Sequence, residues 1–221
     1  MFAVLLDFNG TMIFDSSLHK EAWSKIYQEI YPDDINSPDD SKFYGPRNDI
    51  ILQRMAPFLT AEERDLLSKR KEELYRQMLK QHEDSFPLAP GLECFLNRLQ
   101  QHGIPFALAS ASIKENIDFF YDHFALWRWF RKEDIVFDDG TYADKGAMHL
   151  EAARRLNMQI QDCLLIEDSS SSIRLASENH AGCIVAIGDD ASRDTLLAIG
   201  AHRFIRDFRD FQFEWLETAA Q

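Results

Sequence analysis

The sequence predicts an α/β fold, a doubly wound, Rossmann-like parallel sheet with an all-helical cap inserted after its first strand. Several short runs are uniformly apolar, as expected for parallel strands that are buried on both faces. Helical patterns separate these runs, and alternation of this kind is typical of a doubly wound sheet. One long helical stretch near the N-terminus interrupts the alternation, which predicts the inserted cap.

Six apolar runs are expected to form the strands of this sheet. They are FAVLL at 2–6, IPFALA at 104–109, DIVF at 134–137, CLLI at 163–166, CIVAI at 183–187 and HRFI at 202–205. Amphipathic helical patterns precede two of the runs, at 91–103 and at 145–158. Each helix of this kind would carry the chain back to start the next parallel strand.

The stretch from 14 to 87 is predicted to contain three helices and no strand. The helical patterns lie at 19–31, 48–59 and 60–82, and the last begins with Thr60 and Glu63 at the spacing of a capping box. FPLAPG at 86–91 then marks the return to the sheet. We therefore expect a core domain at 1–13 and 88–221 and a helical cap domain at 14–87, with hinges near Phe14 and Pro87.

Composition excludes several classes of protein. Hydrophobic residues make up 45% and charged residues 28% of the 221 residues, an ordinary composition for a soluble globular protein. The net charge of −13 excludes a basic footprint for nucleic acid. No apolar run approaches the ~20 residues of a membrane span, so we expect no membrane partner. Three scattered cysteines favour reduced thiols and a cytoplasmic protein. We expect a monomer, with a dimer as the alternative.

Polar residues follow the predicted strands where their carboxyl ends would meet. In an open parallel sheet, ligands bind beyond these ends. The residues are Asp7 and Asn9 after the first run, Ser110, Ala111 and Ser112 after the second, Lys145 in the loop after the third, and Glu167 and Asp168 after the fourth. Carboxylate oxygens crowded together suit Mg²⁺, which prefers hard oxygen ligands and commonly shares them with a phosphate group.

These motifs, taken in order, resemble those of the haloacid dehalogenase (HAD) superfamily. The motifs are DFNGT at 7–11, LASAS at 108–112, Lys145 and LIEDS at 165–169. The chain is similar, more narrowly, to the β-phosphoglucomutase-like subfamily with a helical cap. The cap resemblance rests on His19 with Trp23, on Arg47 in GPRND and on Lys71 in SKRKEEL.

The resemblance implies a role for each matching residue of the core. Asp7 would be a nucleophile that takes up a phosphoryl group. Mg²⁺ would be held by Asp7, the main-chain carbonyl of Asn9, Glu167 and Asp168. Lys145 would neutralise charge on the phosphoryl group. The residues that would bind substrate in the core are Gly10, Thr11, Ser110, Ala111 and Lys114.

In the cap, the resemblance implies that Arg47 and Lys71 bind an anionic group of the substrate, Arg47 as a bidentate fork. Alternatives stay open for several of these residues. Asp7 or Ser110 could cap a helix, Glu167 and Asp168 could be a charge pair at a helix N-terminus, and Arg47 and Lys71 could lie on a solvated face. Ser172 stands where the subfamily usually has glycine, which predicts a local packing change.

Asn9 is the main departure from the subfamily, which normally has an aspartate general acid and base at this position. An amide cannot exchange a proton at useful pH, and such catalysis is typically worth ~10²–10⁴-fold. We expect an Mg²⁺-dependent phosphatase or phosphotransferase for a small phosphorylated metabolite such as a sugar phosphate, with His19 as a candidate substitute base. The alternatives are a β-phosphoglucomutase-like isomerase, a low-turnover binding protein, or an Asn9 that is engineered or deamidated.

Overall fold

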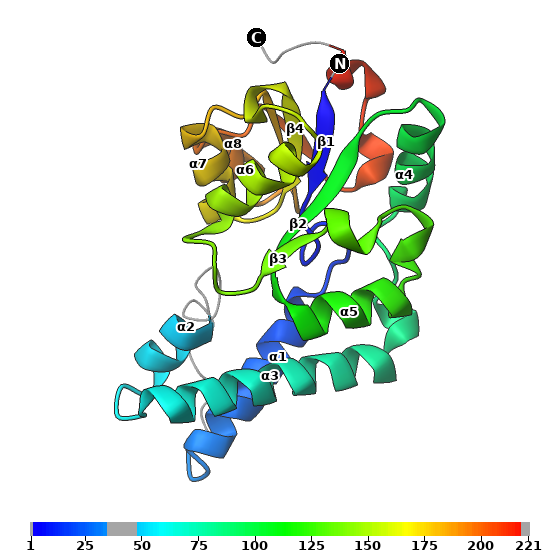
Figure 1. The fold of residues 1–221 in the computed structure, drawn as a ribbon. Coiled ribbons are helices and arrows are strands. Elements are labelled where there is room, and N and C mark those ends of the chain that lie inside the picture. The colour runs from blue at the N-terminus through cyan, green and yellow to red at the C-terminus, as the bar shows by residue number, and fades with distance from the viewer. Residues whose placement is uncertain (1, 35–47, 218–221) are drawn as a thin grey trace. The chain divides into compact units, whose positions relative to one another are not determined.

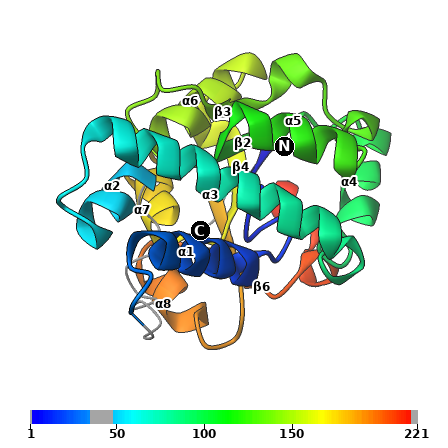
Figure 2. The same cartoon turned by 90° about the horizontal axis from the view of Figure 1, so that it is seen from below.

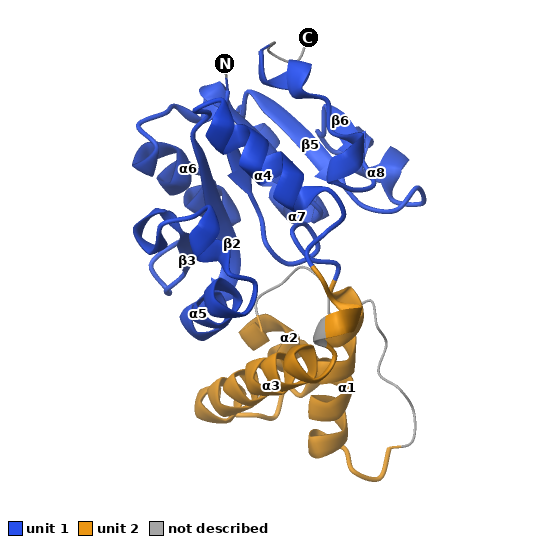
Figure 3. Cartoon of the chain, turned by 90° about the vertical axis from the view of Figure 1, so that its right-hand side faces the viewer, with its two compact units in different colours: residues 1–14, 88–221 blue, residues 15–87 orange. Residues whose placement is uncertain are grey.

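The computed structural model describes residues 2–34 and 48–217 and divides the chain into two compact units. Unit 1 consists of Met1–Phe14 and Leu88–Gln221, and unit 2 is the intervening segment Asp15–Pro87 (Figure 3). The division assigns Phe14 to unit 1, whereas the sequence-based boundary placed it in the helical segment. The chain therefore crosses between the units twice, and each unit is described by itself below.

Unit 1 contains a six-stranded, fully parallel sheet in the order β3-β2-β1-β4-β5-β6, which confirms the predicted fold class. The strands are β1 (Ala3–Leu6), β2 (Phe106–Ile113), β3 (Val136–Asp138), β4 (Cys163–Glu167), β5 (Cys183–Ile187) and β6 (Arg203–Ile205). All six predicted runs form strands. The second strand extends to Ile113, past its predicted end at 109, and its register with β3 shifts between Ser110 and Ile113.

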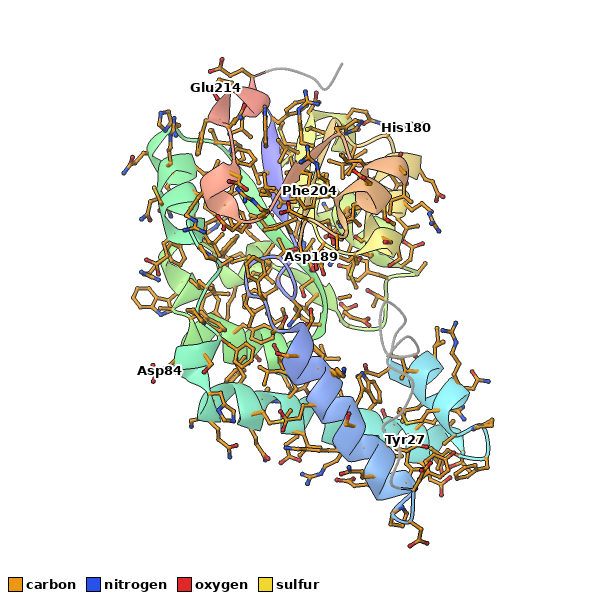
Figure 4. All side chains as sticks on the ribbon, turned by 180° about the vertical axis from the view of Figure 1, so that it is seen from behind. Tyr27, Asp84, His180, Asp189, Phe204 and Glu214 are labelled. Carbon is orange, nitrogen blue, oxygen red and sulfur yellow. The ribbon has the colours of Figure 1, made fainter. Side chains whose placement is uncertain are left out.

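Helices cover both faces of this sheet, which explains why its strands are uniformly apolar. The helices of unit 1 are α4 (Leu92–Gln101), α5 (Lys114–His123), α6 (Lys145–Arg155), α7 (Ser170–Glu178) and α8 (Arg193–Ala198). One buried cluster joins α6, α7 and α8 to the sheet through side chains such as Met148, Ile173 and Leu196. Phe204 of β6 packs against this cluster (Figure 4), and α4 lies on the opposite face (Figure 1).

Unit 2 is helical, with α1 (Ser16–Ile30), α2 (Asn48–Met55) and α3 (Ala61–Gln81). Helices α1 and α3 lie side by side (Figure 2). A small apolar core of Trp23, Ile26, Ile51 and Leu52 joins α1 to α2. The predicted capping box is confirmed, because the Thr60 side chain accepts from the Glu63 N–H while the Glu63 carboxylate accepts from the Thr60 N–H.

The register of β1 against β4 places two acidic residues beside each other. Leu6 pairs with Ile166, and each strand then continues into a carboxylate, Asp7 after β1 and Glu167 at the end of β4. The N–H of Asp7 also donates to the carbonyl oxygen of Ile166 at 3.2 Å. The two central strands, β1 and β4, thus place their acids side by side at the carboxyl ends of the sheet. In the described part of the chain, no helix combines the length and apolarity needed to cross a membrane.

Candidate active site

Three carboxylates converge at the carboxyl edge of the sheet. Asp7, Glu167 and Asp168 each offer one oxygen, and these oxygens lie within 4.8 Å of one another. Asp7 is 8% exposed and Glu167 only 1%. The alternative that Glu167 and Asp168 open a helix is wrong, because Glu167 ends β4 and the following helix has Ser169 as its N-cap. Asp7 likewise caps no described helix, since α1 begins only after Asp15.

Lys145 supplies the positive charge that faces these acids. Its ammonium is ion-paired with Asp7 and lies 3.3 Å from Glu167 Oε1. The sequence predicts Lys145 in the loop after the third strand, but it is the first residue of α6. The helix starts there because Asp144 acts as its N-cap, accepting a hydrogen bond from the Ala147 N–H at 2.9 Å.

Burial and crowding shift the pKa values of these groups in opposite directions. Burial raises the pKa of Asp7 to about 7, helped by the neighbouring Glu167 charge and opposed by Lys145. Burial also acts to raise the pKa of Glu167, but Lys145, His149 and Ser172 outweigh it and lower this pKa to about 2. When all are ionised, three carboxylates against one ammonium leave a formal charge of −2. The site therefore attracts a further cation.

The turn after β1 brings the main chain against Asp168. Gly10 has a φ of +76°, and a Cβ atom added there would lie 2.1 Å from Asp168 Oδ2. The turn is closed by hydrogen bonds from the Thr11 and Met12 N–H groups to the Phe8 carbonyl oxygen. Only glycine combines this backbone conformation with such a close approach, so DFNGT builds a tight loop beside the acids.

Asn9 and the residues after β2 form a second side of the site. The Ser112 hydroxyl donates to Asn9 Oδ1 at 2.7 Å, and the Ser112 N–H donates to Ser110 Oγ at 3.3 Å. Ser110 is buried and Ala111 is exposed. Ser110 is not the cap of the next helix, because α5 has Ile113 at its N-cap position. The structure therefore brings Asn9 and Ser110 together through Ser112.

The acidic group fits a divalent cation. Glu167 Oε2 is buried, and within residues 2–34 and 48–217 it has no hydrogen-bond partner. A buried carboxylate oxygen without a partner is costly in a folded protein unless an ion completes it. Hard oxygen ligands at this density are typical of Mg²⁺ sites.

Comparison with known proteins agrees with this arrangement. The model of the haloacid dehalogenase-like hydrolase family matches residues 4–186, most of the chain. The chain belongs to this family. As expected for a HAD-like hydrolase, the matched stretch includes Asp7, Lys145, Glu167 and Asp168, together with the whole of unit 2.

Three relatives illustrate the similarity. A HAD hydrolase of family IA, variant 3, from Entamoeba histolytica has a TM-score of 0.90 at 29% identity, covering 98% of this chain and 97% of that one. A β-phosphoglucomutase from Clostridium difficile shares the fold, with a TM-score of 0.79 at 22% identity over 98% and 96% of the chains. A bifunctional riboflavin kinase/FMN phosphatase from Arabidopsis thaliana is 29% identical over 132 residues, which is 59% of this chain and 34% of that protein.

The chain spans only between 34% and 37% of the length of the curated relatives it matches.

Three further candidate residues of this HAD-like hydrolase are Lys114, Thr11 and Arg47. Lys114 is largely exposed and ion-paired with Asp118, which also accepts from Lys132 at 3.1 Å. Thr11 is buried, and its Oγ1 has no partner among the described residues. Arg47 lies outside the described residues.

Lys71 is buried in unit 2, so the solvated-face alternative is wrong for this residue. Its Nζ atom lies 2.8 Å from Glu72 Oε1 and 2.8 Å from His19 Nδ1. The ammonium also lies 5.5 Å from the centre of the Trp23 ring. Because Glu72 is the counterion of Lys71, an anionic substrate would have to compete with a carboxylate for this cation.

His19 lies in the same network and uses both ring nitrogens within unit 2. The Lys71 ammonium only donates, so Nδ1 accepts and the ring proton is on Nε2, which lies 3.2 Å from Asp15 Oδ2. The ring stacks on Tyr75 at 4.3 Å. To act as a base, His19 would first have to release the Lys71 contact. Its catalytic role stays a prediction.

Sequence reasoning missed one neighbour of these acids, His149, and gave another, Ser172, only a packing role. Both are buried and both contact Glu167, with His149 Nε2 at 3.3 Å and Ser172 Oγ at 2.6 Å from Oε1. His149 lies four residues after Lys145 on α6, a spacing that places two side chains on one helix face. That spacing is visible in the sequence. Ser172 is not only a packing change, because its hydroxyl donates to an acid of the site.

The buried pair in unit 2 predicts a pH-dependent stability. Burial acts to raise the pKa of Glu72, but the charge of Lys71 and the hydrogen bonds from Lys71 and Asn48 outweigh it and lower this pKa to about 2. A lowered carboxyl pKa stabilises the fold above the unfolded-state value of about 4.5, and the contribution is lost as pH falls toward 2. We expect Glu72→Gln to lower the unfolding free energy by about 3 kcal/mol near neutral pH, and less near pH 3.

Urea denaturation of the full chain, followed by circular dichroism at both pH values, measures this difference. The matched control is Glu73→Gln, the exposed neighbour on the same helix, which we expect to change little. An equal loss for Glu72→Gln at the two pH values would contradict the assignment.

Proposed function

We propose that the chain is an Mg²⁺-dependent phosphatase for a small phosphorylated metabolite and uses Asp7 as its nucleophile. One observation carries the proposal: the Asp7 carboxylate is paired with Lys145 and lies among oxygens of Glu167 and Asp168 within 4.8 Å. The FMN phosphatase activity in the name of the Arabidopsis relative supports a phosphatase. A buried carboxylate with a raised pKa beside a lysine is also a frequent feature of active sites.

The chemistry would proceed in two displacements at phosphorus. In the first, an Asp7 oxygen bonds to phosphorus while the bond to the leaving oxygen breaks, giving an aspartyl phosphate. In the second, water attacks phosphorus, inorganic phosphate leaves, and the Asp7 carboxylate is restored. Lys145 would balance charge on the phosphoryl oxygens, and Ser110 with the Ala111 amide would bind them. Gly10 and Thr11 would keep the loop close to that group.

The bound Mg²⁺, held by Asp7, the Asn9 carbonyl, Glu167 and Asp168, would shield the anionic nucleophile from the anionic phosphate. In unit 2 we propose a cap in which Arg47 and Lys71 bind a distal anionic group, as Lys114 would in unit 1. Lys71 would do so in exchange for Glu72, its present partner. Such an exchange would make binding sensitive to the charge of the substrate.

Asn9 restricts the substrates that such a site can turn over. Its amide oxygen accepts from Ser112, and an amide cannot protonate a leaving oxygen. Aryl and acyl phosphates need little protonation and should react more readily than sugar phosphates. A mutase would need a base in both half-reactions, so the isomerase alternative is disfavoured. The same observation favours a second candidate function, a binding protein for phosphorylated metabolites with little turnover.

Phosphate release tests the proposal directly. We expect the full chain to release phosphate from aryl or acyl phosphates when Mg²⁺ is present and to stop when EDTA removes it. Asp7→Asn should lower the rate by at least ~10³-fold, because the nucleophile is lost. Asp139→Asn, an exposed acid outside the site, is the control. Unchanged turnover in Asp7→Asn would exclude Asp7 as the nucleophile, and ligand-dependent melting without any release would favour the binding protein.

The contribution of Asn9 can be measured in the same assay. We expect Asn9→Asp to raise turnover of alkyl phosphates by roughly tenfold or more, with a smaller gain on aryl phosphates, because it restores a general acid. Asn9→Ala removes the amide without adding an acid and serves as the control. If the ratio of alkyl-phosphate turnover to aryl-phosphate turnover is the same in Asn9→Asp and Asn9→Ala, the missing acid does not limit the turnover rate.

A further inference from the structure

The two oxygens of Glu167 have different surroundings. Oε1 lies 2.6 Å from Ser172 Oγ, 3.3 Å from Lys145 Nζ and 3.3 Å from His149 Nε2. Oε2 is buried but has no hydrogen-bond partner in the part of the chain that the structure describes. Three donors thus occupy one oxygen, and the other is left for a ligand that is not a protein donor.

His149 is held against Oε1 by its Nε2 atom. An ionised carboxylate only accepts, so Nε2 carries a proton and donates it to this contact. Nδ1 is buried and has no partner among the described residues. A buried nitrogen without a hydrogen-bond partner is unfavourable, so packing alone does not explain a histidine at this position. The contact with Glu167 does offer an explanation.

Ser172 is distinguished from the serines beside it. Ser170 and Ser171 are exposed on the first turn of α7, whereas Ser172 is 2% exposed. Its N–H donates to the Ser169 hydroxyl at 3.3 Å, and this cap starts the helix with Ser172 turned inward. The Ser172 hydroxyl donates to Glu167 and lies 3.4 Å from His149 Nε2. Ser172 and His149 therefore act on the same oxygen.

We propose that His149 and Ser172 are positioning residues that limit Glu167 to one metal ligand atom, Oε2, and thereby favour Mg²⁺ over Ca²⁺. Ca²⁺ accepts six to eight oxygens and commonly takes a carboxylate through both, whereas Mg²⁺ demands a near-ideal octahedron. Occupation of Oε1 by protein donors disfavours the two-oxygen mode. The proposal rests on the proposed function in so far as that function supplies the metal site.

Metal binding tests the proposal without any substrate. The full chain and its variants are titrated with Mg²⁺ and, separately, with Ca²⁺, and amide chemical shifts in NMR spectra give each Kd. We expect Ser172→Ala and His149→Leu to weaken Mg²⁺ binding by ~10–100-fold, the usual effect of removing a group that orients a ligand. Ca²⁺ binding should weaken much less, so that the preference for Mg²⁺ falls by about tenfold or more.

Conservative and control variants separate positioning from general damage. His149→Gln keeps an N–H donor near Nε2 and should restore most of the preference, while Ser171→Ala changes an exposed serine and should leave it unchanged. Melting in EDTA identifies any variant that does not fold. If His149→Leu fails to fold, the Ser172→Ala variant carries the test.

The outcomes distinguish this proposal from the proposed function. The ratio that decides is the Kd for Ca²⁺ divided by the Kd for Mg²⁺. If this ratio is unchanged in folded Ser172→Ala, the positioning role is overturned and the metal-dependent function is left intact. Failure of the unmodified chain to bind either ion would overturn the metal-dependent function and this proposal with it. The proposal is supported if this ratio is lower in Ser172→Ala and His149→Leu and returns toward that of the unmodified chain in His149→Gln.

Discussion

The site depends on one interaction, the ion pairing of the Lys145 ammonium with two buried carboxylates. It meets Asp7 and Glu167 at the ends of two neighbouring strands, where burial alone would drive the carboxylates toward their neutral forms. The parallel register brings these acids together, and the N-cap of α6 brings the lysine to them. The excess negative charge that remains would favour a divalent cation at the carboxyl ends of these strands and, in the proposed function, a phosphate group beside it.

Much of this arrangement follows from the sequence because it depends on local pattern and topology. Uniformly apolar runs predict buried parallel strands, and the rule that ligands bind beyond the carboxyl ends of such strands places Asp7, Glu167 and Asp168 together. Thr60 and Glu63 likewise predict a helix start from four residues of sequence, because a capping box involves only near neighbours.

The contacts that the sequence did not show depend on how helices pack. Lys71 is buried because Trp23, His19 and Glu72 surround it, and two of these come from α1, about 50 residues earlier in the chain. His149 and Ser172 meet only because α6 and α7 lie against each other beneath Glu167. Helical periodicity indicates which face of a helix is buried, but not which side chain of another helix it will touch.

In the proposed function, Asn9 would remove acid–base help at the leaving oxygen, while Glu167 would hold the metal ion. The proposed chemistry requires Asp7 to attack phosphorus beside a bound cation. The most direct measurement is a crystal structure of the full chain with Mg²⁺ and beryllofluoride, a mimic of a phosphoryl group. We expect beryllium to be bonded to an Asp7 carboxylate oxygen, with Lys145 contacting the fluorides and Mg²⁺ bound by Glu167 and Asp168. An unmodified Asp7, with the ion bound elsewhere, would contradict it.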